Sequence, residues 1–103
     1  MLIPLPENPD AKTCYYYAKN ILGERVPKKY EDIIRTDAYY AYWYALYVIK
    51  GRWTEAEEAI KTDACSAYYY ARDIIKDRWI EAEEVIRTDA YYWNGYKEHF
   101  KLC

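Results

Sequence analysis

Apolar side chains recur along this chain at helical spacing, in short runs separated by polar turns. The clearest run begins at Ala38 and continues at positions 3, 4, 7, 10 and 11 residues further on. At about 100° per residue, these positions share one side of an α-helix. A second, shorter run spans residues 53–60. The pattern therefore predicts two short helices, each with one buried face. The first run consists of Ala38, Ala41, Tyr42, Ala45, Val48 and Ile49, and the second of Trp53, Ala56 and Ile60.

The residues at the predicted helix ends fit capping rules. Thr36 and Asp37 precede the first helix, where side-chain oxygens bind the free amides of the first turn. Gly51 follows that helix and is expected to adopt the left-handed conformation that ends it. Thr54 and Glu57 have the spacing of a capping box at the start of the second helix. We therefore expect a helix–turn–helix unit over these residues.

The same unit recurs along the chain. Thr-Asp-Ala begins at residues 36, 62 and 88, an interval of 26 residues each time. The stretch from Asp10 is a divergent copy with one extra residue, and the last copy stops after its first half. A pair of short helices cannot bury its own apolar face, so the units must stack. We therefore predict an all-α protein, an α-solenoid of stacked short helical hairpins, as one domain over residues 1–103. Its three full repeats and half-repeat cap are residues 9–35, 36–61, 62–87 and 88–103.

The repeat also resembles a known group of proteins. The motif Thr-Asp-x-x-x-Ala-Tyr-x-Tyr-Ala, followed by Gly-Arg-Trp-x-Glu-Ala-Glu, is similar to short tandem helical repeats in uncharacterised proteins of bacteriophages and other large DNA viruses. The match covers residues 10–96 and is clearest over residues 36–86. The resemblance implies an α-solenoid and a viral source, and it brings no catalytic residues. Copies depart from the motif at Val26, at Asp77 and at Asn94-Gly95, and the last departure predicts an interruption of the final helix.

Composition and charge narrow the functional classes. The chain has 15 Lys and Arg against 17 Asp and Glu, a net charge of −2, which disfavours binding to nucleic acid through phosphates. Cys14, Cys65, Cys103 and one histidine are too few and too dispersed for a disulfide framework or a zinc site. Met1–Pro6 lacks a signal-peptide pattern, and no run approaches the roughly 20 apolar residues of a membrane span. We therefore expect a cytoplasmic protein without metal or cofactor, in the host cytoplasm if its source is viral.

Residues repeated in every unit are best explained by the fold. We call each set of residues that occupy the same position in successive units a column. The aspartate column is expected to cap the first helices, and the arginine and glutamate columns are expected to form ion pairs between neighbouring units. An acid–base or metal constellation is the alternative, but a catalytic site has no reason to recur in each unit, whereas a stacking contact does. Phosphate-binding glycine loops and nucleophile–histidine pairs are also missing, and we predict no enzymatic activity. The columns are Asp10, Asp37, Asp63 and Asp89; Arg25, Arg52 and Arg78; Glu31, Glu57 and Glu83; Tyr17, Tyr44 and Tyr70; Tyr15, Tyr42 and Tyr68; and Ala18, Ala45 and Ala71.

One aromatic stripe distinguishes the second unit from the others. Tyr40, Trp43 and Tyr47 lie three and seven residues apart on the side opposite the core stripe, flanked by Tyr39 and Leu46. An exposed stripe of this kind favours a protein-binding hot spot, where Tyr and Trp are enriched. The alternative is that the curvature of the solenoid buries the stripe against the neighbouring first helix. Other units carry smaller or polar residues at the positions of the three stripe residues, namely Thr13, Tyr16 and Asn20 in the first and Ser66, Tyr69 and Asp73 in the third.

The C-terminal half-repeat is a second candidate interface. An incomplete solenoid exposes its last seam unless that seam is capped, so this end is expected either to form a self-sufficient cap or to bind a partner or a second copy of the chain. His99 is expected at a helix end rather than as a ligand. Cys14 replaces an alanine of the repeat and is expected to be buried, with Cys65 partly exposed. The candidate interface residues are Tyr91, Tyr92, Trp93, Tyr96 and Phe100.

These observations favour a non-enzymatic protein–protein interaction module. Given the resemblance, the concrete hypothesis is a small, anti-CRISPR-like phage protein that binds and inhibits or redirects a host protein complex of antiviral defence. The alternative is a single-stranded nucleic-acid-binding repeat protein that stacks Tyr and Trp on bases. Nucleic acid is the less favoured partner because the basic residues are scattered by the repeat rather than gathered in a groove. No membrane partner is expected.

Overall fold

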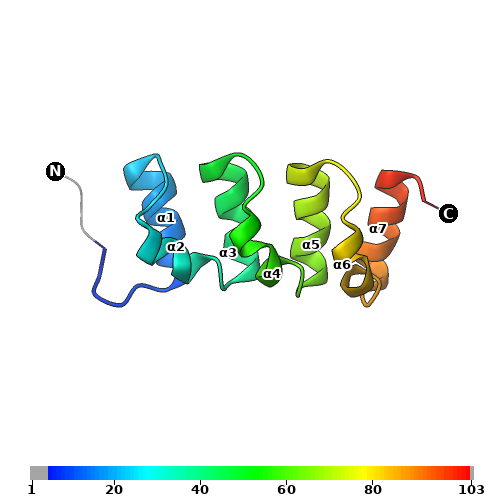
Figure 1. Ribbon diagram of the computed structural model, residues 1–103, viewed down its shortest axis with the longest axis horizontal. Coiled ribbons are helices and arrows are strands. Elements are labelled where there is room, and N and C mark those ends of the chain that lie inside the picture. Colours follow the sequence, from blue (N-terminus) through cyan, green and yellow to red (C-terminus); the bar gives the residue numbers. More distant parts are fainter. Residues whose placement is uncertain (1–4, 103) are drawn as a thin grey trace.

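The protein is a row of stacked helix pairs. A computed structural model describes residues 5–102, which form helices and turns without any β-strand. The molecule measures 53 × 20 × 20 Å, and Figure 1 shows the helix pairs following one another along the long axis. The all-α prediction is confirmed, and the stacking agrees with the predicted α-solenoid. Cys103 lies outside the described residues.

Each unit contributes a first helix and, except for the last, a second helix. The first helices are α1 (Ala11–Tyr16), α3 (Ala38–Tyr44), α5 (Ala64–Tyr70) and α7 (Ala90–Phe100). The second helices are α2 (Lys28–Ile34), α4 (Glu57–Ile60), which follows the 3₁₀ turn η3 (Thr54–Ala56), and α6 (Ile80–Ile86). Three first helices continue directly into a π-helical turn, namely η1 (Tyr17–Leu22), η2 (Ala45–Ile49) and η4 (Ala71–Ile75).

The aspartate column caps the first helices, as predicted. The side chain of Asp37 accepts a hydrogen bond from the backbone N–H of Tyr40 at 3.0 Å. Such a cap satisfies an amide that the helix itself leaves free, and it typically stabilises by about 1 kcal/mol. Asp10 accepts the same bond from the N–H of Thr13, Asp63 from that of Ser66, and Asp89 from those of Tyr91 and Tyr92.

The first helices end differently from the prediction. The left-handed residue after α3 and η2 is Lys50 (φ 64°), not Gly51, and Lys76 (φ 63°) occupies the same place after η4. The N–H of Lys50 donates to the carbonyl of Ala45, five residues earlier, at 2.7 Å. This wide turn places the left-handed position one residue before the glycine, and its hydrogen bond outweighs the steric cost of about 1 kcal/mol for a lysine there.

The last helix is not interrupted at Asn94-Gly95, contrary to the prediction. Helix α7 runs unbroken over Ala90–Phe100. A Cβ atom added at Gly95 would lie 3.2 Å from the ring carbon Cζ of Tyr68. The glycine therefore serves packing, because it lets the Tyr68 ring of the preceding unit approach the backbone of α7.

The second helices contribute the other half of the core. Trp53, Ala56 and Ile60 are buried, as the pattern predicted. The predicted capping box is wrong, because no side chain caps η3 and Glu57 instead binds Arg52 at 2.8 Å. Cys14 is fully buried among the alanines of its column, as predicted.

A buried tyrosine joins each unit to the one before it. The hydroxyl of Tyr44 donates to Glu31 Oε2 at 2.6 Å and accepts from the Val26 N–H at 3.0 Å. Glu31 also accepts two hydrogen bonds from Arg25, at 2.6 and 3.0 Å. The predicted Arg–Glu ion pairs therefore form, but within a unit rather than between units, and tyrosine provides the link. In the equivalent junctions, Tyr70 donates to Glu57 and accepts from the Trp53 N–H, and Tyr96 donates to Glu83 and accepts from the Trp79 N–H. Arg52 and Arg78 donate to the same two glutamates.

These junctions shift the protonation of both partners. Hydrogen bonds from Arg78 lower the pKa of Glu83, outweighing the opposite effect of burial, and Tyr96 lowers it further. Burial, together with the hydrogen bond to Glu83, raises the pKa of Tyr96 to about 12. At neutral pH the carboxylate is therefore charged and the phenol neutral, as their hydrogen bond requires.

Candidate binding groove on the first helices

The aromatic stripe of the second unit is split between exposed and half-buried residues. Tyr39 and Tyr47 expose 51% and 44% of their surface, whereas Tyr40, Trp43 and Leu46 are half-buried. Each predicted alternative therefore describes part of the stripe: the neighbouring helix covers one edge and leaves the other open to solvent.

The covered edge faces α1. The ring of Tyr40 lies 5.9 Å from the ring of Tyr15, measured between centroids, and 6.5 Å from that of Tyr16. Tyr15 is itself buried, and burial raises its pKa to about 12. Tyr40 thus contributes to packing between the first and second units.

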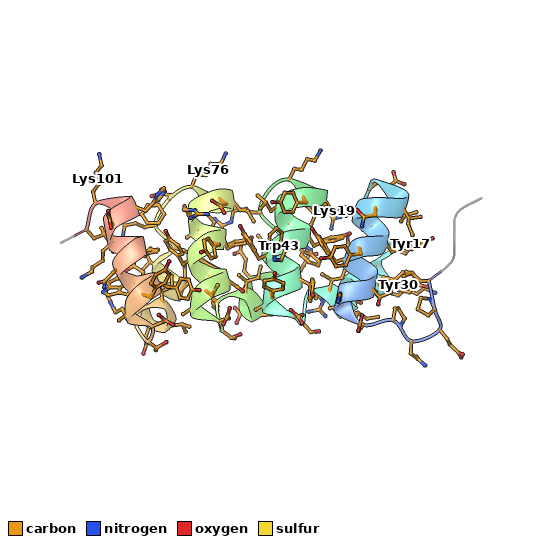
Figure 2. All side chains as sticks on the ribbon, turned by 180° about the vertical axis from the view of Figure 1, so that it is seen from behind. Tyr17, Lys19, Tyr30, Trp43, Lys76 and Lys101 are labelled. Carbon is orange, nitrogen blue, oxygen red and sulfur yellow. The ribbon has the colours of Figure 1, made fainter. Side chains whose placement is uncertain are left out.

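The open edge lines a groove between the second and third units. This α3/α5 groove has a volume of about 390 Å³ and lies between α3–η2 and α5–η4. Figure 2 shows Trp43 near the middle of the molecule, on α3. The residues that line the groove are Tyr39, Tyr42, Trp43, Leu46 and Tyr47 from the second unit and Cys65, Ser66, Tyr69, Arg72 and Asp73 from the third.

Trp43 is the central aromatic residue of the groove. Its ring stacks on Tyr47, with centroids 5.2 Å apart and planes inclined by 15°, and it meets the edge of Tyr39 at 5.8 Å. Its indole Nε1 is the one buried side-chain nitrogen or oxygen without a hydrogen-bond partner in residues 5–102. A buried donor left unpaired typically costs about 1–3 kcal/mol. The central residue of the groove wall therefore has one buried, unsatisfied donor, and it lies beside the exposed rings of Tyr39 and Tyr47.

An arginine–aspartate pair forms the opposite wall. Asp73 accepts from Arg72 Nε at 2.7 Å and Nη2 at 3.0 Å, and from the hydroxyl of Tyr42 at 2.6 Å. Burial by itself would raise the pKa of Asp73, but these hydrogen bonds outweigh it and lower the pKa. The guanidinium of Arg72 also lies 4.6 Å above the ring of Tyr69, in cation–π geometry.

Sequence reasoning did not include this wall in the site. The available signal was that Arg72 and Asp73 replace Leu46 and Tyr47 of the second unit, so these positions vary from unit to unit like the aromatic stripe. What could not be read from the sequence was that η4 places them across the groove from Trp43.

The other first helices form two similar grooves. The α1/α3 groove, of about 310 Å³, shares Tyr39 and Trp43 with its neighbour and adds Lys19. The amine of Lys19 lies 4.8 Å above the ring of Tyr47. The α5/α7 groove, of about 350 Å³, includes Arg72, Tyr91 and Glu98. Trp43 thus lies on the wall shared by two grooves.

The second candidate interface is only partly accessible. Tyr91 is 76% exposed, but Tyr92, Trp93 and Phe100 are half-buried. Tyr96 is fully buried, because its hydroxyl completes the junction with Glu83, so its assignment to an interface is wrong. His99 is exposed in the last turn of α7, and Cys65 is half-buried.

Comparisons with protein-family models, with curated proteins and with solved structures gave no match for this chain. The resemblance to phage repeats therefore stays a prediction. Within residues 5–102, no helix has both the length and the apolar character to cross a membrane. The same residues contain no group of three or more His, Cys, Asp and Glu side chains arranged to hold a metal ion.

Proposed function

We propose that the protein is a non-enzymatic interaction module that binds a partner protein in the α3/α5 groove. The observation that carries this proposal is the exposure of Tyr39 and Tyr47 on either side of a half-buried Trp43. Large aromatic rings bury much area for little conformational entropy, and Trp and Tyr are enriched in binding hot spots. The groove is also concave, which allows a partner side chain to be enclosed on two sides.

The partner that we propose is a host protein. The repeat motif resembles phage and viral helical repeats, and a small protein with a rigid aromatic face is suited to block or redirect a larger complex. A component of an antiviral defence complex in the host cytoplasm is the concrete candidate.

A comparison of groove variants tests the proposed face. The Tyr39→Ala/Tyr47→Ala variant removes two exposed rings and leaves Tyr40, which packs against α1, in the chain. Tyr91→Ala is the matched control, because it removes a still more exposed ring from α7. In affinity capture from host lysate, the double variant is expected to lose a partner that the intact chain and the control retain.

The same capture experiment can reject the proposal. If the intact chain and the double variant capture the same partner equally, the groove is not the binding face. If only Tyr91→Ala loses the partner, the C-terminal interface is the binding face instead.

Single-stranded nucleic acid is the second candidate partner. It is supported by the row of tyrosine rings that continues from Tyr42 to Tyr69 at 6.2 Å and from Tyr69 to Tyr92 at 6.0 Å. Bases can stack on such rings, but sites of this kind normally add a cationic groove. Binding of an oligothymidylate that weakens steeply as salt rises would favour this candidate over a protein partner.

A further inference from the structure

We infer that the occupant of the α3/α5 groove is an acidic peptide segment of the partner, which carries one apolar anchor side chain between carboxylates. This inference rests on the proposed function and specifies the chemistry of the partner. It is argued from the hydrogen-bond donors, the charge and the apolar floor of the groove.

Within the part of the chain that the structure describes, the one carboxylate that lines the groove is already hydrogen-bonded, whereas the indole N–H of Trp43 is free. The carboxylate of Asp73 already accepts hydrogen bonds from Arg72 and from Tyr42. By contrast, the N–H of Trp43 has no acceptor. A ligand rich in acceptor oxygens therefore complements this surface better than one rich in donors.

The charged residues around the groove also favour an acidic ligand. Among the described residues that line the α3/α5 and α1/α3 grooves, the charged ones are Lys19, Arg72 and Asp73. Arg72 and Asp73 neutralise each other at 2.7 Å. Lys19 lies over the ring of Tyr47 rather than against a carboxylate. The lining of the α3/α5 groove is thus neutral by itself, and Lys19, over the Tyr47 ring of that groove, adds one positive charge beside it in a protein whose total is −2. This charge favours a negatively charged ligand.

The unpaired N–H of Trp43 makes binding more favourable for a ligand that carries a hydrogen-bond acceptor. A buried donor without an acceptor is less stable than a paired one. A carbonyl or carboxylate oxygen that reaches Nε1 recovers part of this free energy, which an apolar or cationic ligand cannot do. Tyr47 stacks on the same indole ring and is 44% exposed, so it is an accessible neighbour of this donor.

The floor of the groove accounts for the apolar anchor. Leu46, Trp43 and Tyr69 present half-buried apolar surface to the cavity. An aliphatic or aromatic side chain inserted there covers surface that is otherwise in contact with water. A carboxylate on one side of the anchor then lies toward Lys19, above the Tyr47 ring. A carboxylate on the other side lies toward Nη1 of Arg72, since Asp73 is bound by Nε and Nη2 of that side chain.

Selection from a random peptide library tests the inference. The intact chain is immobilised, a peptide-display library is passed over it, and peptides that also bind the Tyr39→Ala/Tyr47→Ala variant are removed. We expect the selected peptides to carry Asp and Glu around one apolar residue. Enrichment of basic or uncharged peptides, or no enrichment at all, would overturn the inference.

Two variants then test the assigned contacts with the best selected peptide. Trp43→Phe keeps a ring and removes the N–H, so we expect about threefold to tenfold weaker binding, the range for one hydrogen bond. Lys19→Gln removes the exposed charge, and we expect slower association and a weaker dependence on salt. Tyr17→Phe is the control, because Tyr17 lines neither groove, and it should leave binding unchanged. Equal binding by Trp43→Phe and the intact chain would also overturn the inference.

Failure here is distinguishable from failure of the proposed function. If uncharged peptides are selected and still require Trp43, the groove binds protein but the acidic assignment is wrong. If the library yields nothing and oligothymidylate binds with a steep salt dependence, both the inference and the protein partner are overturned.

Discussion

At the scale of single residues, the phenol hydroxyl is the group that links one repeat to the next. Tyr70 donates to Glu57 at 2.7 Å and accepts from the N–H of Trp53 at 2.9 Å. Phenylalanine would fill the same space but could satisfy neither group. The abundance of tyrosine, 15 residues against one phenylalanine, follows in part from this double role.

Tyr70→Phe is therefore expected to destabilise the protein. The substitution leaves the buried N–H of Trp53 unpaired and removes a donor from Glu57, for a loss of about 1–3 kcal/mol in the free energy of unfolding. Urea denaturation followed by circular dichroism measures this loss. Tyr17→Phe is the matched control, since Tyr17 belongs to the same repeat column but is only half-buried and precedes the first Arg–Glu pair, Arg25 and Glu31, in the chain. A change within about 0.5 kcal/mol is expected for the control. Equal effects of the two substitutions would contradict the assigned role.

At the scale of the element, the ends of the first helices differ between units. The first three continue into π-helical turns and stop at Gly23, Lys50 and Lys76, whereas α7 stays α-helical and stops at Lys101. At the repeat interval of 26 residues, Lys76 corresponds to residue 102, so the last helix stops one residue sooner in its unit than the helix before it. The reason is that a π turn accommodates one extra residue. The turns η2 and η4 also carry residues that line the α3/α5 groove, so the extra residue affects the shape of that groove.

Replacing the left-handed lysine by glycine is expected to stabilise the protein. Lys76→Gly removes a steric conflict between Cβ and the following carbonyl, with a gain of about 0.5–1 kcal/mol in the free energy of unfolding. The reverse exchange, Gly23→Lys, is expected to lower it by a similar amount, because Gly23 has φ 70°. Thermal unfolding of the two variants beside the parent chain measures both. A loss of stability in Lys76→Gly would show that the lysine side chain makes a compensating contact.

At the scale of the whole molecule, stability resides in contacts between neighbouring units. The junctions of Tyr44, Tyr70 and Tyr96 repeat the same bonds along the long axis. In such an array stability is a sum over units and their interfaces. Helix α7 completes the last of these junctions, which is how a half-repeat covers the third unit.

The junctions predict a stability plateau bounded by two pH limits. The pKa values of Glu31, Glu57 and Glu83 are lowered from 4.5 in the folded state. Their contribution is therefore complete above pH 4.5 and is lost as the pH falls below it. The pKa of Tyr96 is raised from 10.0 to about 12, so its contribution is complete below pH 10 and is lost as the pH rises toward 12.

Urea unfolding measured across the pH range checks this plateau. A Glu83→Gln variant provides the comparison, because it removes one carboxylate that titrates on the acid side. We expect its stability to fall less steeply with acid than that of the parent chain. If the free energy of unfolding falls equally steeply with acid in the two proteins, Glu83 does not contribute to the pH dependence of stability.

Much of the architecture could be predicted because it depends on local rules and on repetition. The interval of 26 residues, the aspartate caps and the buried Trp53 and Ile60 follow from helix periodicity and side-chain chemistry within a few residues. Predictions that depended on one residue type at one place were less successful. The sequence predicts that Gly51 and Gly95 end or interrupt helices. In the structure the π turn places the left-handed residue at Lys50 instead, and Gly95 makes room for the ring of Tyr68.

The sequence by itself determined the helix pairs, their number and their stacking, because a repeated amphipathic pattern has few other ways to bury its apolar face. Only the tertiary structure decided which aromatic residues remain accessible and which groups face them. Tyr40 and Tyr47 lie on the same helix face, yet the first is covered by α1 and the second is open to solvent. The rotation between adjacent helices produces this difference, and it also brings Arg72 and Asp73 opposite Trp43. That rotation arises from the packing of many side chains from different units, which no local sequence pattern encodes.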